Sequence, residues 1–325
     1  MTNGKIIESD FKQAWWLPEQ HSQTLFSTVF KRKSPIHLTT DEVDLPDGDF
    51  VEIAWTEPRH QGPVIVLFHG MEGSVKSSYA QGILHTIEQL GWQGVLMHFR
   101  GCGSRDNRLP RWYHSGDSPD IDFFIRYLQE HYPNRPLGAI GVSLGGNALL
   151  KYLGEQGDAS PLTAAMAISV PFDLANTSQH LTRGFSRIYQ RHLIKLVQKK
   201  VIQKYKKMPL AIDIEAFKQA KTFYQVDNAA AKMHGFASAD DYYKRASARQ
   251  FLKTITVPTW ILHSKNDPFM TRDAIPQEHE LASKVTMELT NKGGHVGFIY
   301  GNNPLKANYW IDHRVKTFFE SQFIE

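Results

Sequence analysis

Ser143 lies in the pattern Gly141-Val142-Ser143-Leu144-Gly145, which is typical of a serine nucleophile on a sharp turn between a strand and a helix. The flanking glycines leave room for that turn, where larger side chains would clash. An apolar stretch precedes the motif, and 146–152 continues with a helical pattern. We therefore predict that Ser143 stands at a helix N-terminus, whose dipole favours negative charge on a substrate oxygen.

A serine becomes a good nucleophile only when a base takes its proton and a carboxylate holds that base in the right tautomer. In a strand-turn-helix arrangement of this kind, the acid and then the histidine follow the serine along the chain. Asp267 and His295 satisfy this order, each in a loop after a predicted strand. Asp173 is a competing acid. An Asp before Pro268 is also a common turn residue, and a His among glycines is often an ordinary loop residue.

The segment His69-Gly70-Met71-Glu72-Gly73 follows an apolar strand and is placed where an oxyanion-binding loop belongs. The predicted donors are the backbone N–H groups of Met71 and of Leu144, the residue after the nucleophile. A plain turn that uses glycine for its backbone freedom is the alternative. Cys102 is a second possible nucleophile by residue type, but no base is placed beside it, so packing in a glycine turn is the favoured interpretation.

Apolar runs that alternate with helical patterns must position these side chains, and such alternation is typical of a mostly parallel sheet flanked by helices. The carboxyl ends of its strands are free to hold a site. Residues 36–56 predict an antiparallel hairpin around Pro46-Asp47-Gly48. The predicted parallel strands are 63–68, 94–99, 137–142, 164–170, 257–263 and 284–289, and the predicted helices are 77–90, 121–131, 146–154 and 305–319.

The alternation stops between residues 170 and 257, where apolar residues recur at spacings of three and four. This indicates a helical cap inserted into the α/β core. The predicted organisation is an N-terminal arm packed by its aromatic residues (1–40), the first part of the core (41–172), the cap insertion (173–250) and the second part of the core (251–325).

The net charge of +4 comes from one segment. Nine of the 37 Lys and Arg lie in 183–207, which has no Asp or Glu, so 28 remain against 33 acidic residues elsewhere. This distribution argues against a nucleic-acid-binding surface. A cationic helix with an apolar face predicts either weak contact with an anionic membrane or a solvated cap helix. A single cysteine, no evident signal peptide and no membrane-spanning run make the cytoplasm the expected location.

The chain resembles the YheT-like branch of the α/β-hydrolase superfamily, whose members are mostly predicted esterases. The resemblance spans nearly the whole chain and is carried by Trp15-Trp16-Leu17 with His21 and Gln23-Thr24, His69-Gly70-Met71-Glu72-Gly73-Ser74, Arg100-Gly101-Cys102-Gly103, Tyr113-His114-Ser115-Gly116, the serine motif, Asn266-Asp267-Pro268 and Gly294-His295-Val296-Gly297. It implies an α/β-hydrolase fold and assigns Ser143, Asp267 and His295 to the triad. It also implies hydrolysis of carboxylic esters, with lipid-like acyl substrates in some relatives.

Together these patterns predict a serine esterase that acts through an acyl-enzyme on a small-molecule or lipid-like ester and needs neither metal nor organic cofactor. An acyltransferase with the same acyl-enzyme and a non-catalytic binding protein on the same fold are the alternatives. The chain lacks a dinucleotide fingerprint, because Ser143 replaces the second glycine, and it contains neither the Gly-Lys pair of a P-loop nor a His-Glu-x-x-His zinc motif.

Overall fold

A nine-stranded sheet forms the centre of the computed structural model, which describes residues 3–29 and 36–324. The strand order is β1-β9-β8-β7-β6-β4-β5-β3-β2, parallel from β1 to β5 and antiparallel at β3 and β2. The strands are β1 (Lys5–Glu8), β2 (Thr39–Asp44), β3 (Phe50–Trp55), β4 (Val64–Phe68), β5 (Gln93–Met97), β6 (Leu137–Val142), β7 (Ala164–Ile168), β8 (Thr259–Ser264) and β9 (Val285–Thr290). A small separate pair is formed by β10 (Ile299–Tyr300) and β11 (Asn308–Tyr309).

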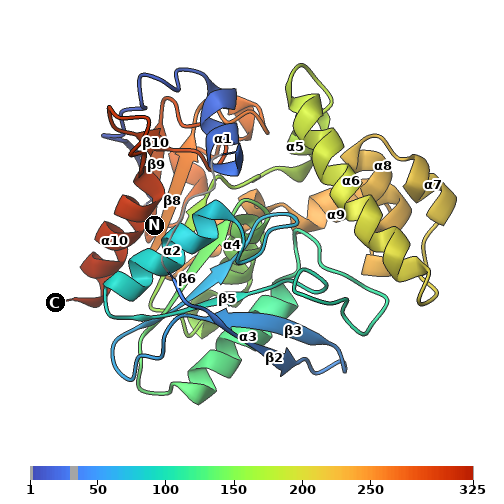
Figure 1. Cartoon of the computed structure of the whole chain (residues 1–325), viewed down its shortest axis with the longest axis horizontal. Coiled ribbons are helices and arrows are strands. Elements are labelled where there is room, and N and C mark those ends of the chain that lie inside the picture. Colours follow the sequence, from blue (N-terminus) through green and yellow to red (C-terminus); the bar gives the residue numbers. More distant parts are fainter. Residues whose placement is uncertain (1–2, 30–35, 325) are drawn as a thin grey trace.

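Helices cover both faces of the sheet, which explains why its central strands are apolar throughout. Along β4, Val64, Val66 and Phe68 pack on one face, whereas Ile65 and Leu67 pack on the other. The first face is covered by α3 (Ser118–His131) and α4 (Leu144–Gln156), and the second by α2 (Ser78–Gln89) and α10 (Trp310–Phe323). Figure 1 shows these helices around the sheet. The predicted α/β architecture is confirmed.

Five helices follow β7 and precede β8, and we call them the cap helices. They are α5 (Leu174–His180), α6 (Ser186–Tyr205), α7 (Ile214–Gln219), α8 (Phe223–Ala230) and α9 (Ala239–Ala246). All five lie within the range predicted for an insertion, and Figure 1 shows them grouped to one side of the sheet. Short 3-10 helices are η1 (Gly157–Ala159), η2 (Ala231–His234), η3 (Ala248–Thr254), η4 (Arg272–Ala274) and η5 (Glu278–Glu280).

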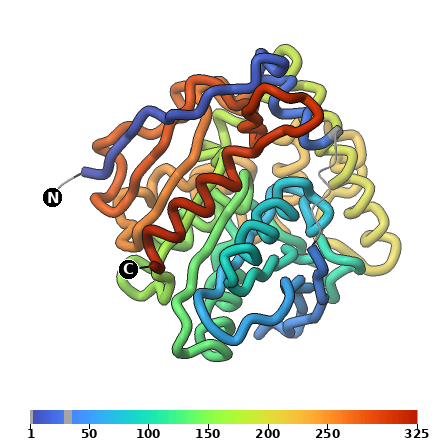
Figure 2. Tube along the Cα trace, turned by 60° about the vertical axis from the view of Figure 1, so that its left-hand side comes forward, coloured from blue at the N-terminus to red at the C-terminus, as the bar shows by residue number. Residues whose placement is uncertain are grey.

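The N-terminal segment contributes more than the predicted arm. Its strand β1 pairs with β9 and extends the sheet by one parallel strand, and the N-terminal trace runs beside the last strands in Figure 2. It continues into α1 (Gln20–Val29). Of the two tryptophans expected to pack, Trp16 contacts Phe26 with a ring separation of 5.0 Å, but Trp15 is 68% exposed. The prediction that the aromatic residues of the arm pack on the body is therefore wrong for Trp15.

Element boundaries differ from the prediction mainly where turns interrupt an apolar pattern. The last helix begins at Trp310, not at residue 305, because 308–309 forms β11 against β10. The helix after β6 begins at Leu144, directly after the serine. The hairpin of β2 and β3 is confirmed, with Asp44 opposite Phe50 and Gly48 at a φ of 86° in the turn.

Candidate active site

Ser143 occupies a strained turn between β6 and α4. Its φ of 53° and ψ of −117° lie in a region that residues with side chains rarely adopt. A Cβ on Gly141 would lie 2.5 Å from the Gly145 carbonyl oxygen, and one on Gly145 would lie 2.4 Å from the Phe68 carbonyl oxygen. The two glycines are therefore needed because the turn packs directly against the backbone of β4 and of its own helix.

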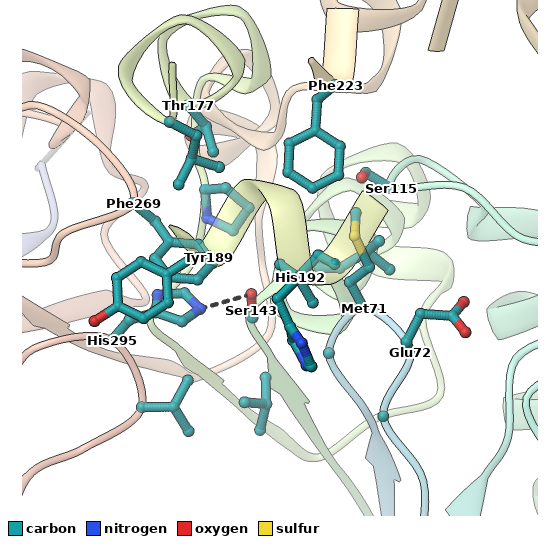
Figure 3. A pocket seen from close by; sticks show the side chains of 18 of the residues that line it. Met71, Glu72, Ser115, Ser143, Thr177, Tyr189, His192, Phe223, Phe269 and His295 are labelled. Atoms are coloured by element: carbon teal, nitrogen blue, oxygen red, sulfur yellow. Dashed lines mark hydrogen bonds between the residues drawn. The ribbon is translucent and has the colours of Figure 1, made fainter. Parts of the chain in front are cut away.

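The structure brings Asp267 and His295 to Ser143 from the ends of two neighbouring strands. Asp267 follows β8, and His295 lies in the loop after β9. His295 Nε2 lies 2.9 Å from Ser143 Oγ, and His295 Nδ1 lies 2.7 Å from Asp267 Oδ2. The aligned bonds run from acid to base to hydroxyl, and Figure 3 shows the imidazole pointing at the serine.

Backbone hydrogen bonds hold the histidine loop in place. Asn266 Oδ1 accepts from the N–H groups of Gly293 and Gly294 at 3.0 and 3.1 Å. Thr24 Oγ1, in α1, accepts from the His295 N–H at 2.9 Å. A Cβ on Gly294 would come within 2.6 Å of that same hydroxyl oxygen, so the glycine allows α1 to approach closely. Thr24 and Asn266 have no role that the sequence pattern alone predicts, although both lie in motifs that carry the family resemblance.

The ring of Phe269 fixes the plane of the imidazole. It is stacked on His295 with 3.8 Å between ring centroids and an angle of 6° between planes. The backbone N–H of Phe269 also donates to Asp267 Oδ1 at 2.8 Å, which leaves Oδ2 for the histidine. Sequence reasoning missed this residue, which lies two positions after the acid.

The loop after β4 places backbone donors beside Ser143. The N–H of Gly70 donates to Tyr79 Oη and the N–H of Glu72 donates to Tyr113 Oη, both at 2.8 Å. Between them, the N–H of Met71 has no hydrogen-bond partner among the described residues, and neither has that of Leu144 at the start of α4. Both residues line the same cavity as Ser143 and His295. This geometry allows two N–H groups to bind an oxyanion.

The other acidic, thiol and imidazole side chains near the site have different roles. Asp173 Oδ1 accepts from the Asn176 N–H at 3.0 Å and caps α5, and it is Asp267 that contacts His295. Cys102 is buried, and burial raises the pKa of its thiol to about 12, so the thiol is protonated at neutral pH. It does not line the cavity. Burial also lowers the pKa of His263 to about 4, which keeps that ring neutral.

A cavity of about 350 Å³ lies between the strand ends and the cap helices. Ser143, His295 and Met71 form its floor, while α5, α6, α8 and α9 contribute to its walls. Most of its lining is apolar, including Leu25, Leu174, Leu193, Leu196 and Phe223. In Figure 3, Phe223 and Thr177 face the cavity from the side of the cap. Such a space suits a ligand with an apolar portion that reaches a polar reacting group.

The basic segment 183–207 is divided between inward and outward cations. Lys200 Nζ lies 2.8 Å from Glu72 Oε2, Lys204 Nζ bonds to Asn107 Oδ1, and Lys207 pairs with Asp106. Burial lowers the pKa of Lys204 to about 8. Lys200 and Lys204 therefore fasten α6 to the core, whereas Lys207 forms its ion pair at an exposed position.

Within residues 3–29 and 36–324, no group of three or more His, Cys, Asp or Glu side chains could hold a metal ion. No helix in those ranges is both long enough and apolar enough to span a membrane.

Known proteins resemble this chain in sequence and in fold. Residues 63–302 match the protein family described as the alpha/beta hydrolase fold. An Escherichia coli (strain K12) protein named "Putative esterase YheT" is 41% identical over 301 residues, which cover 91% of this chain and 88% of that protein. Phospholipase ABHD3 of Mus musculus is 28% identical over 327 aligned residues, with 97% and 79% covered. The Pyrococcus furiosus esterase Pf2001 shares the fold, with a TM-score of 0.57 at 13% identity over 99% of this chain and 100% of that chain.

Proposed function

The chain belongs to the α/β-hydrolase fold family, and from that premise we propose that Ser143, His295 and Asp267 are a catalytic triad. The chain is an ester-hydrolysing enzyme of this family. The observation that carries the triad proposal is the pair of bonds that joins the three side chains, 2.9 Å from His295 to Ser143 and 2.7 Å from His295 to Asp267. Ser143 and His295 line the floor of the cavity that a substrate would enter.

The proposed reaction is a two-step acyl transfer to water. Ser143 Oγ attacks the ester carbonyl carbon while His295 Nε2 takes the hydroxyl proton, and the carbonyl electrons move to an oxyanion held by the N–H groups of Met71 and Leu144. The carbon–oxygen bond to the alcohol then breaks, and His295 gives that alcohol its proton. Water attacks the acyl-enzyme in the same way and releases the acid and the free serine. Asp267 holds the tautomer and stabilises the imidazolium.

A fluorophosphonate probe tests the nucleophile directly. The wild type is expected to become labelled at one serine, and Ser143→Ala is expected to remain unlabelled. Ser169→Ala is a matched control, because Ser169 also has a positive φ of 51° but has no hydrogen bond to a histidine ring among the described residues. Equal labelling of the wild type and Ser143→Ala would refute the assignment.

Lipid-like acyl esters are the substrate class that the cavity supports best. Its apolar walls and its volume of about 350 Å³ suit an acyl chain. The similar mouse protein is named a phospholipase, which agrees with such a substrate. A series of nitrophenyl esters of increasing chain length measures this preference through kcat/KM. A maximum at the shortest acetyl ester would contradict the proposal.

Contact with an anionic membrane is a second proposed property, and it rests on the outer face of α6. Apolar and cationic side chains are exposed there next to each other, and they comprise Phe185, Ile188 and Leu196 with Arg187, Arg191, Lys195 and Lys199. Leu196 also lines the cavity, so this surface borders the opening to the site. Cations near an anionic surface contribute about 1 kcal/mol each.

Vesicle sedimentation tests the membrane proposal. The protein is expected to bind phosphatidylglycerol vesicles and to bind phosphatidylcholine vesicles much more weakly. Replacing Arg187, Arg191 and Lys195 by Gln is expected to abolish the difference. The matched control replaces Lys232, Lys244 and Lys253, which lie on other parts of the chain, by Gln. Binding that is independent of lipid charge would contradict the proposal.

A further inference from the structure

Asp227 places a carboxyl group inside the cap half of the cavity. It lies on α8, whose first residue, Phe223, faces the cavity in Figure 3. Asp227 also lines a smaller inner pocket of about 50 Å³. The two spaces share Met71 and Leu144, so Asp227 lies where the inner pocket opens from the main cavity. Aromatic rings surround the inner pocket, including those of Trp112, Tyr113, Phe236 and Tyr242.

No cation compensates this carboxyl group among the described residues. Its hydrogen-bond partner there is Tyr243, whose hydroxyl donates to Asp227 Oδ2 at 2.6 Å and also lies 3.0 Å from Ser178 Oγ. Oδ1 has no hydrogen bond to another described residue. By contrast, Glu72, which lines the same cavity, is paired with Lys200. Removing an acid from water without a cationic partner is unfavourable for folding, so this feature requires a different explanation.

Burial raises the pKa of Asp227 to about 7, so its protonated and ionised forms are both populated near neutral pH. An ammonium group would lose its hydration on entering this pocket, which is lined largely by aromatic and aliphatic side chains. A hydroxyl group can donate to the ionised form and accept from the protonated form. Perturbed acids inside a cavity are also typical of functional sites.

Other unpartnered polar atoms face the same region. Both ring nitrogens of His234, which lines the inner pocket, are buried and have no hydrogen bond within the described part of the chain. The same holds for Thr177 Oγ1 in the main cavity. Burial lowers the pKa of His234 well below its usual value, so this ring is neutral and can accept a hydrogen bond. A hydroxylated ligand would supply partners that the protein does not.

The position of Asp227 also indicates which part of a substrate it meets. In the proposed reaction, the leaving alcohol must lie beside His295 to receive its proton. His295, Phe269 and Val296 line the main cavity but not the inner pocket. The inner pocket instead adjoins Met71 and Leu144, the proposed oxyanion donors. A group that reaches Asp227 therefore extends away from the leaving alcohol, in the direction left to the acyl chain.

We propose that Asp227 is a specificity-determining residue that binds a hydroxyl group on the acyl chain, so that the preferred substrates are hydroxyacyl esters. This inference rests on the proposed function of Ser143. In this arrangement the hydroxyl end of the acyl chain enters the inner pocket. The carbons between that hydroxyl and the ester carbonyl contact the apolar walls of the main cavity.

Matched ethyl esters test this proposal. Linear acyl chains of graded length, each ending in a methyl or a hydroxyl group, are compared by kcat/KM. At the matching length, the ratio of hydroxyl to methyl substrates is expected to fall by about tenfold or more in Asp227→Leu, because a hydrogen bond to a charged group is lost. Asp227→Asn keeps an acceptor oxygen, and its ratio is expected to lie between those of the wild type and Asp227→Leu.

Asp240→Leu is the matched control. Asp240 is also a cap residue bonded to a tyrosine, with Tyr224 Oη 3.0 Å from Asp240 Oδ2, but it is exposed and lies outside the catalytic cavity. Its ratio is expected to equal that of the wild type. A purely structural role for Asp227 predicts a lower thermal midpoint in Asp227→Leu, whereas removal of an uncompensated acid predicts an equal or higher midpoint.

Three outcomes would overturn the inference: an unchanged ratio in Asp227→Leu, an equal loss in Asp240→Leu, or a preference that depends on Asp227 but follows a hydroxyl placed in the alcohol, as in hydroxyethyl esters. Failure of the proposed function is distinguishable, because it would appear as equal fluorophosphonate labelling of the wild type and Ser143→Ala, whatever the hydroxyl preference.

Discussion

Lys200 of the cap helix α6 is bound to Glu72 of the loop after β4, with 2.8 Å between Nζ and Oε2. Glu72 directly follows Met71, has a positive φ of 52°, and also accepts from the Tyr113 hydroxyl at 2.8 Å. The cap is therefore attached to the loop that carries a proposed oxyanion donor. Any displacement of α6 would act on the position of the Met71 N–H group.

We expect Lys200→Met to lower both stability and kcat. Removing one partner leaves the Glu72 carboxylate without its cation in a largely buried position, which costs about 3 kcal/mol in the free energy of unfolding. The loosened loop should lower kcat by about tenfold, less than the loss of a whole oxyanion donor. Denaturant unfolding and steady-state kinetics measure the two effects.

Lys206→Met is the matched control for this prediction, because Lys206 is exposed at the C-terminal end of α6. The double variant Glu72→Gln/Lys200→Met should recover part of the lost stability, since no unpaired charge remains. Equal effects of Lys200→Met and Lys206→Met would argue against the coupling.

The sequence was sufficient to predict the proposed nucleophile because the information around Ser143 is local. A strand, two glycines and a helix start are all contained in a short segment, and the order of Asp267 and His295 follows from the topology. The pair of Lys200 and Glu72 could not be predicted in this way. It joins residues 128 positions apart, and neither residue lies in a pattern that indicates its partner.

The cap shows the same limit. Its helical periodicity was visible in the sequence, but periodicity does not tell which polar residue faces a cavity. Asp227 is one of several acidic residues there, and its hydrogen bond from Tyr243 and its place in the cavity lining distinguish it. Strand β1 was missed because four residues at a sheet edge, two of them charged, give too short an alternation to detect.

Asp267→Asn is expected to lower kcat by about 10⁴-fold with the fold intact, because the amide stabilises the wrong tautomer of His295. Asp173→Asn, at the competing acid, should keep the wild-type rate. Its carboxylate only caps α5, and asparagine caps a helix about equally well. Steady-state kinetics on a nitrophenyl ester distinguishes the two variants. Similar losses in both would contradict the assignment of the acid.

Stability should fall as the pH is lowered through the range below about 6.5. Burial lowers the pKa of His69 to about 3 and that of His263 to about 4, whereas an unfolded histidine titrates near 6.5. Between those values the unfolded chain binds more protons than the folded one, so each ring removes about 1.4 kcal/mol of stability per pH unit of acidification. The pKa of Asp227 is raised to about 7, so its contribution to the pH dependence has the opposite sign: between pH 3.8 and 7 it adds stability as the pH falls.

The measurement is the free energy of unfolding in denaturant at several pH values. His263→Leu should reduce the slope between pH 6.5 and 4 by about one proton. The matched control is His279→Leu, which removes an exposed histidine of η5 and should leave the slope unchanged. A slope that is the same in wild type and His263→Leu would contradict the linkage.

Thr24 is expected to act as a positioning residue for His295, because its hydroxyl accepts the His295 N–H at 2.9 Å and donates to the Gln20 carbonyl oxygen at 2.8 Å. Thr24→Val keeps the shape but leaves that N–H unpaired, which should destabilise the loop by about 1–3 kcal/mol. We expect kcat to fall about tenfold while KM stays nearly constant, since the loss is in the placement of the base and not in the walls of the cavity.

Thr24→Ser restores the acceptor without the methyl group and should recover most of kcat. A variant that merely disturbed the packing of α1 would respond in the opposite order, with Thr24→Val milder than Thr24→Ser, because valine keeps the apolar contacts. Comparing the two substitutions by kcat and by thermal midpoint therefore separates the hydrogen bond from the packing. The hydrogen bond should dominate, because α1 approaches the loop so closely at Gly294 that the hydroxyl oxygen lies within 2.6 Å of where a Cβ would stand.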